Sequence, residues 1–159
     1  ATGVVQPQKA YDAINWEVFF LLAGLIPLGI AVEQSGTAQY LAAHILNMSV
    51  YLSPIVLLAV FYFITALLAA AVGNNASVVL MLPVAVKAAL QLGLNPFAFV
   101  LTVTFAASGS FMSPIGYQTN LMVYGPGGYN FIDYIKVGAP LQLLLTIVVP
   151  VFVTLFWGL

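Results

Sequence analysis

The sequence predicts an all-α polytopic membrane protein, and its composition is the first reason. Of its 159 residues, 63% are hydrophobic and only 4% are charged, whereas soluble domains usually carry about 25% charged residues. A soluble protein also has to cover its surface with polar groups, and this chain has too few of them. Several apolar runs approach the roughly 20 residues with which a helix crosses a bilayer. A lipid bilayer is therefore the expected surrounding of the chain.

Several functions are excluded by charge and residue type. The net charge of -1 leaves no basic surface for nucleic acid. The chain has no cysteine, and its single histidine, His44, cannot form a zinc site alone. We recognise no Ser-His-Asp set, no phosphate-binding glycine loop with its lysine and no paired carboxylates, so we do not expect an enzyme.

The elements follow one another along the chain in a simple order. Residues 1–13 are a polar lead-in, expected to be the end of a cytoplasmic linker, and residues 14–159 are predicted to form one transmembrane domain. A first span is expected over residues 14–32, with Trp16 at the interface where aromatic residues concentrate. Residues 33–48 are expected to form an interfacial or partly buried amphipathic helix. Because the chain lacks an initiator methionine, we expect it to be part of a longer protein.

Residues 52–92 are predicted to form a re-entrant helical hairpin. Two apolar arms are joined there by a polar tip at Gly73, Asn74 and Asn75. The second arm has about 15 apolar residues, which is short for a complete crossing. Irregular backbone at membrane depth also has to be shielded by protein or line a wet cavity. A hairpin that enters and leaves on one side therefore fits the sequence better than two spans.

Residues 97–124 are predicted to form one discontinuous helix. An apolar run is interrupted there by the polar, proline-containing segment 113–120 and then resumes. The run of serine and glycine at 108–110 is expected to be a small-residue packing face, which lets helices approach closely. A short surface helix is expected over 130–137, and the last span over 139–158.

Polar sequence at the two breaks predicts a binding site. Unwound backbone presents carbonyl oxygens that suit a hard cation such as Na+, and helix N-termini present N–H groups that suit an anion. A hairpin tip that faces a broken helix supplies both, as in secondary transporters with discontinuous helices. Simple capping of the second arm and a proline kink in the broken helix remain open alternatives. The candidate residues for a cation and an anionic substrate are Gly73, Asn74, Asn75 and Ser77 at the tip, and Gly116, Thr119 and Asn120 at the break.

Three segments carry a resemblance to a known family. They are Ile14-Asn15-Trp16-Glu17, then Gly73-Asn74-Asn75-Ala76-Ser77 followed by Met81-Leu82-Pro83, and last Phe111-Met112-Ser113-Pro114-Ile115-Gly116-Tyr117-Gln118-Thr119-Asn120. With these segments the chain resembles the C-terminal half of the divalent anion:sodium symporters (sodium/sulfate/dicarboxylate symporters of the ion transporter superfamily), and among them bacterial permeases with TrkA-C domains. That family has a Ser-Asn-Thr motif at each hairpin tip. The resemblance matches this motif to Asn74, Asn75 and Ala76, and so assigns sodium and substrate contact to Asn75.

The resemblance implies a secondary transporter that couples uptake of a small divalent anion, sulfate or a dicarboxylate, to Na+. It implies that the chain is one of two inverted repeats, and that the N-terminal half of the same transporter completes the site. It also implies a homodimer in the inner membrane, with the carbonyl of Gly116 facing sodium. Two other functions stay open. One is an efflux carrier of the same superfamily, for a metalloid such as arsenite, and the other is a non-transporting membrane scaffold or sensor.

Overall fold

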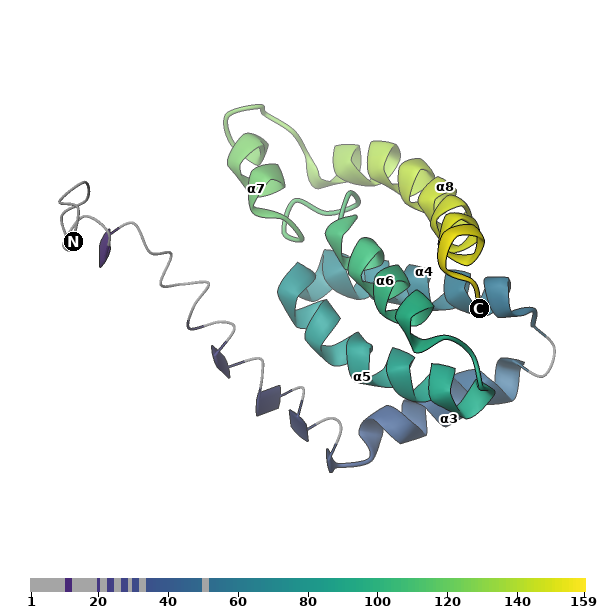
Figure 1. The fold of residues 1–159 in the computed structure, drawn as a ribbon. Coiled ribbons are helices and arrows are strands. Elements are labelled where there is room, and N and C mark those ends of the chain that lie inside the picture. Colours follow the sequence, from purple (N-terminus) through teal and green to yellow (C-terminus); the bar gives the residue numbers. More distant parts are fainter. Residues whose placement is uncertain are drawn as a thin grey trace, which may run out of the picture.

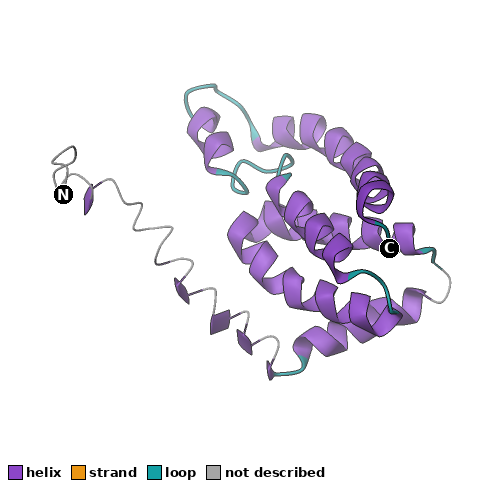
Figure 2. Ribbon diagram, in the orientation of Figure 1, coloured by secondary structure: helices purple, strands orange, loops and turns teal. Residues whose placement is uncertain are grey.

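The computed structural model describes two long stretches of the chain and several isolated residues before them. The described residues are 11–12, 20, 23–24, 27–28, 30–31, 34–49 and 52–159. Within these ranges every regular element is a helix and no strand occurs (Figure 2). The predicted all-α class is therefore confirmed. Most of the predicted lead-in and of the predicted first span lies outside the described residues.

Helices in the described part of the chain form a compact bundle with one short outlying helix. They are α3 (Thr37–Ser49), α4 (Pro54–Val72), α5 (Asn74–Leu92), α6 (Pro96–Ser108), α7 (Gln118–Tyr124) and α8 (Phe131–Trp157). By length and composition, α4, α5 and α8 can each cross a membrane. Helix α6 packs against all three of them, while α3 packs on α5 (Figure 1).

The surface of the bundle is apolar where a soluble protein would be polar. On α8, Ile147, Leu155 and Phe156 are 68%, 74% and 71% exposed, respectively. Further large apolar side chains are exposed on α4, α5 and α6. Soluble monomers rarely expose such extended apolar surface, whereas lipid-facing helices require it. The chain is a multi-pass membrane protein.

The hairpin between α4 and α5 turns at a single residue, Gly73. Its φ of +90° lies in a region that residues with a side chain rarely adopt. The Gly73 N–H donates to the Ala69 carbonyl (3.0 Å) and closes α4, and its own carbonyl accepts from the Ser77 N–H (3.2 Å) and opens α5. Figure 1 shows α5 returning beside α4 from this point.

The second arm of the hairpin is longer than the sequence suggested. We expected about 15 residues from the apolar run alone, but α5 has 19 residues, as many as α4. The difference arises because Asn74 and Asn75, which read as a polar loop, already form the first turn of α5. Arm length therefore does not distinguish a re-entrant hairpin from two crossings, and the re-entrant path stays a prediction.

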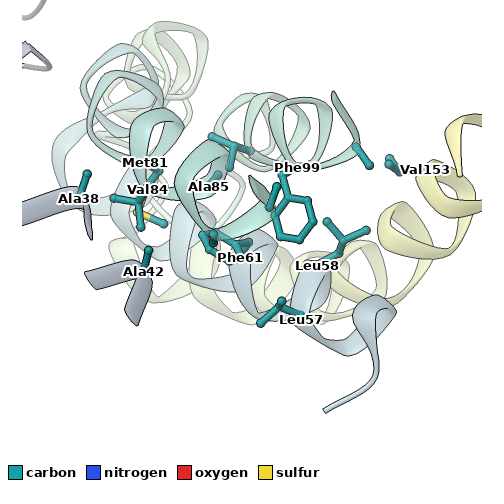
Figure 3. Close-up of a cluster of buried hydrophobic side chains, with 14 residues drawn as sticks. Ala38, Ala42, Leu57, Leu58, Phe61, Met81, Val84, Ala85, Phe99 and Val153 are labelled. Atoms are coloured by element: carbon teal, nitrogen blue, oxygen red, sulfur yellow. The ribbon is translucent and has the colours of Figure 1, made fainter. Parts of the chain in front are cut away.

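The core of the bundle combines two phenylalanines with many alanines. Phe61 of α4 and Phe99 of α6 meet edge to face, with ring centroids 5.4 Å apart (Figure 3). Ala85 of α5 is fully buried beside them, and Ala38 and Ala42 of α3 are buried against α5. Small side chains let helices approach closely in a membrane, where packing rather than the hydrophobic effect holds them together.

The last helix joins two elements that we had expected to be separate. The predicted surface helix over 130–137 and the predicted span over 139–158 form one continuous helix, α8. It begins at a capping box in which Asn130 and Asp133 satisfy each other's backbone N–H groups. Pro140 is accommodated inside the helix, as proline often is in membrane helices. At its far end, the Trp157 carbonyl accepts a hydrogen bond from the Asn95 side chain at the start of α6 (3.0 Å).

Gly138 of α8 packs directly against the backbone of the break after α6. A Cβ atom there would overlap the carbonyl group of Phe111 and lie 2.9 Å from Met112 Cα. We predict that Gly138→Ala lowers the free energy of unfolding by about 1–3 kcal/mol, because backbone has to move. Thermal unfolding of the purified protein in detergent measures this. The control is Gly125→Ala, where a Cβ has open space and φ is -70°; equal losses in both variants would contradict the prediction.

Candidate functional site

The hairpin tip contacts the break between α6 and α7 through the amide of Asn74. One terminal atom of this amide lies 2.9 Å from the carbonyl oxygen of Ala107 and 2.7 Å from that of Gly116. With the nitrogen in this position, the amide donates a hydrogen bond to each carbonyl. Ala107 lies in the last turn of α6, and Gly116 lies in the break. The two polar interruptions predicted from the sequence therefore meet at one point.

Gly116 is buried at this meeting point, and the surrounding chain leaves no room for a side chain there. A Cβ atom there would overlap the hydroxyl of Ser110 and lie 3.0 Å from the carbonyl oxygen of Ala69. Ala69 belongs to the last turn of α4, so the break passes directly against the end of the hairpin's first arm. Glycine at this position brings a backbone carbonyl of the break within reach of Asn74.

Asn120 holds the non-helical segment from the α7 side. Its side-chain nitrogen donates to the carbonyls of Ser110 (3.0 Å) and Ser113 (3.2 Å). The Tyr134 hydroxyl of α8 in turn donates to the Asn120 carbonyl (2.9 Å). The predicted site residue Asn120 therefore fixes the shape of the break, and its amide nitrogen is already engaged with backbone.

The remaining predicted residues fall into two groups. Ser77 is fully buried, and its hydroxyl donates to the Asn74 carbonyl (2.8 Å), so it supports the first turn of α5. Asn75 and Thr119 are exposed, in the first turns of α5 and α7. At the tip, it is therefore Asn74 rather than Asn75 that faces the break. The sequence could not separate these neighbours, because both are asparagines.

Two contributors to the site were missed by the sequence analysis. The Ala107 carbonyl could not be predicted from the sequence, because every residue has a backbone carbonyl. Ser110 was assigned to a packing face, but it is only 3% exposed and its hydroxyl has no hydrogen-bond partner within the described structure. A serine between an apolar helix and a proline-containing break could have drawn notice as a buried polar group.

The oxygen atoms at this point suit only some ions. Within the described residues no group of three His, Cys, Asp or Glu side chains could hold a metal. The oxygen atoms that converge here are the neutral backbone carbonyls of Ala107 and Gly116, which match a hard cation rather than a transition metal. The last carbonyls of α6 also lie at the negative end of its helix dipole.

Asn120 also lines a cavity of about 430 Å³. Its walls come from the break, α7 and the first half of α8, and they are mostly apolar. Its lining residues are Phe111, Asn120, Val123, Tyr129, Asp133, Tyr134, Val137, Gly138 and Leu141. The Asp133 carboxylate in this wall would repel an anion, so we do not assign the substrate to this cavity.

Spanning helices whose polar interruptions meet inside the bundle define a membrane protein built like a secondary transporter. Residues 1–104 match the family of citrate transporters called CitMHS. The chain belongs to this family. The match confirms, with the relatives below, that the resemblance inferred from the hairpin tip and the break was correct at the level of the family.

Known relatives are similar along nearly the whole chain. An uncharacterised transporter of Synechocystis is 56% identical over 99% of the chain, which covers 26% of that relative. Sodium/sulfate cotransporter 2 of Chlamydomonas reinhardtii is 34% identical over 92% of the chain and 17% of the relative. The mouse Na+/citrate cotransporter is 26% identical over 81% of the chain and 22% of the relative. The chain thus spans about a quarter or less of these relatives, and their names describe transporters rather than enzymes.

We predict that Asn120→Ala destabilises the protein, because two carbonyls of the break lose their donor. An unsatisfied buried polar group costs about 1–3 kcal/mol. The expected result is a lower midpoint of thermal unfolding in detergent. The neighbouring Thr119→Ala, at an exposed position, should stay within about 0.5 kcal/mol of the wild type. If Asn120→Ala unfolds at the wild-type temperature, the amide does not hold the break.

Proposed function

We propose that the complete protein is a secondary active transporter that takes up a small divalent anion together with Na+. The observation that carries this proposal is the contact of the Asn74 amide with the Ala107 and Gly116 carbonyls. The names of the relatives support the chemistry, because they include sodium/sulfate and Na+/citrate cotransporters. A sodium-coupled carrier needs a cation site next to an anion site, and the hairpin tip and the break supply suitable groups for both.

The cation site is assigned to the point where Asn74 meets the break. Rotation of the Asn74 amide by half a turn places its oxygen where the nitrogen otherwise donates. That oxygen and the carbonyls of Ala107 and Gly116 then face one position, with the Gly73 backbone beside them. Carbonyls of unwound backbone and of helix C-termini are the groups that coordinate Na+ in transporters with broken helices.

The anion is assigned to the exposed polar groups beside that position. Asn75 and Thr119 have free surface in the first turns of α5 and α7, and Asn74 and Asn120 adjoin them in sequence. Ser77 contributes through its bond to the Asn74 carbonyl. A cation held nearby would attract the anion and couple the two binding events. The N-terminal half of the transporter would close the site from the opposite side.

The complete protein is expected to work by alternating access. This chain would supply one of two inverted repeats, and two copies of the whole protein would form a homodimer in the inner membrane. The apolar outer surface of α8 and the buried polar break support a membrane carrier over a scaffold or sensor, because a scaffold has no need of unpaired polar groups at membrane depth.

The test follows uptake by the full-length protein in proteoliposomes. Labelled sulfate, succinate and citrate are offered with and without an inward sodium gradient. We predict sodium-driven uptake of at least one of them, and the preferred anion identifies the substrate class. No sodium-dependent uptake of any of the three would contradict the proposal and favour the efflux carrier.

We predict that Asn74→Ala lowers sodium-driven uptake by about 10–100-fold, because it removes a ligand of the cation. The matched control is Asn95→Ala. Asn95 also stands at the start of a helix, where its side chain accepts from the Phe97 N–H, but at the opposite end of α5. Its loss should lower stability and leave the sodium dependence of uptake unchanged. Normal uptake by Asn74→Ala would show that the hairpin tip does not contribute this ligand to the cation site.

A further inference from the structure

Ser110 is one of two buried residues, with Gln142, whose side chain has a polar atom without a hydrogen-bond partner in the described part of the chain. It follows directly on Gly109 at the end of α6 and is 3% exposed. Its hydroxyl has no hydrogen-bond partner within the described residues. Buried polar atoms are nearly always satisfied, so an unpaired hydroxyl requires an explanation such as a bound ion or water.

A second buried serine in the same segment gives a direct comparison. Ser113 is also 3% exposed, but its hydroxyl accepts a hydrogen bond from the Ile115 N–H (3.1 Å). This bond shapes the turn after Pro114 and accounts for the residue structurally. Ser110 has the same burial and side chain but no such role. A comparison of the two serines therefore distinguishes an effect on stability from an effect on ion binding.

The Ser110 hydroxyl points at the residue that carries the cation site. It lies so close to Gly116 that a Cβ there would overlap it. The carbonyl of the same glycine is 2.7 Å from the Asn74 amide. The Ser110 backbone is held in place because its carbonyl accepts from the Asn120 side chain (3.0 Å). The hydroxyl and the Asn74 amide therefore converge on one residue from two different segments.

The surroundings of this hydroxyl favour a cation over an anion. The carbonyl oxygen of Ala69 borders the same space at Gly116 as the Ser110 hydroxyl, and the carbonyls of Ala107 and Gly116 meet at the Asn74 amide. These oxygens carry partial negative charge, so they repel an anion and attract a hard cation. The Asn120 amide, which could have served an anion, already donates to two carbonyls.

We propose that the Ser110 hydroxyl oxygen is a further ligand of the coupling cation, beside the Asn74 amide oxygen and the carbonyls of Ala107 and Gly116. The inference rests on the proposed sodium-coupled function and adds a residue to that site. Removal of the hydroxyl should weaken sodium binding and leave the anion contacts in place. The expected signature is therefore a change in sodium affinity rather than in substrate affinity.

The experiment compares Ser110→Ala, Ser110→Cys and Ser113→Ala in the full-length protein. Cysteine keeps the volume of the site but replaces a hard oxygen with a soft sulfur, so it tests ligation without leaving a cavity. Two quantities are measured: the sodium concentration for half-maximal uptake in proteoliposomes, and the sodium-dependent rise in unfolding temperature in detergent, with N-methyl-D-glucamine as the replacement cation.

Both Ser110 variants should need about tenfold more sodium for half-maximal uptake and should lose most of the sodium-dependent thermal shift. Their KM for the anion at saturating sodium should stay near the wild-type value. Ser113→Ala should unfold at a lower temperature and keep its sodium response. Wild-type sodium affinity in Ser110→Cys would overturn the inference and leave the proposed function standing. A wild-type protein without any sodium response would instead overturn the proposed function, and this inference with it.

Discussion

The hydrogen-bonding contact between Asn74 and the carbonyls of Ala107 and Gly116 is the interaction on which the rest of the site depends. Two interruptions of regular helix lie within one apolar bundle, and each leaves backbone groups that lipid cannot satisfy. At this contact one interruption satisfies the other. The bundle can therefore contain non-helical backbone at depth, and the same polar groups are available for an ion. The contact of Asn74 with the two carbonyls therefore stabilises the fold and also brings together the groups of the proposed cation site.

Close packing makes this contact reachable. Gly73 reverses the chain within one residue, so that Asn74 starts α5 directly beside the end of α4. Gly116 then lies against the Ala69 carbonyl, and Gly138 brings α8 onto the backbone of the break. Alanines in α5 and α6 keep the helices themselves close. A side chain at Gly116 or Gly138 would push the packed segments apart, whereas Gly73 is required for its φ of +90°.

Much of this arrangement could be predicted from the sequence, because composition and polar interruptions are local signals. The all-α class, the hairpin tip and the broken segment all follow from them. The direction in which each side chain of a helix points is not a local signal. Consecutive residues differ by about 100° around the helix axis, and only the start of α5 at Gly73 decides that Asn74 faces the break. Ser110 and Ser113 are likewise equivalent in sequence, and only the fold gives one of them a backbone partner. The continuity of α8 was also missed, because its first turns carry Asp133 and Lys136 and read as a surface helix separate from the apolar span.

The continuous helix α8 has a mechanical consequence. Its 27 residues extend over about 40 Å. Hydrogen bonds join this helix to both ends of the segment that runs from the start of α6 to α7. Tyr134 holds Asn120 at one end, and the Trp157 carbonyl accepts from Asn95 at the other. Helix α8 therefore bridges both ends of the segment that runs from α6 through the break. Any displacement of the break along the bundle would have to move α8 as well or break one of these two hydrogen bonds. We therefore expect α6, the break and α8 to move together.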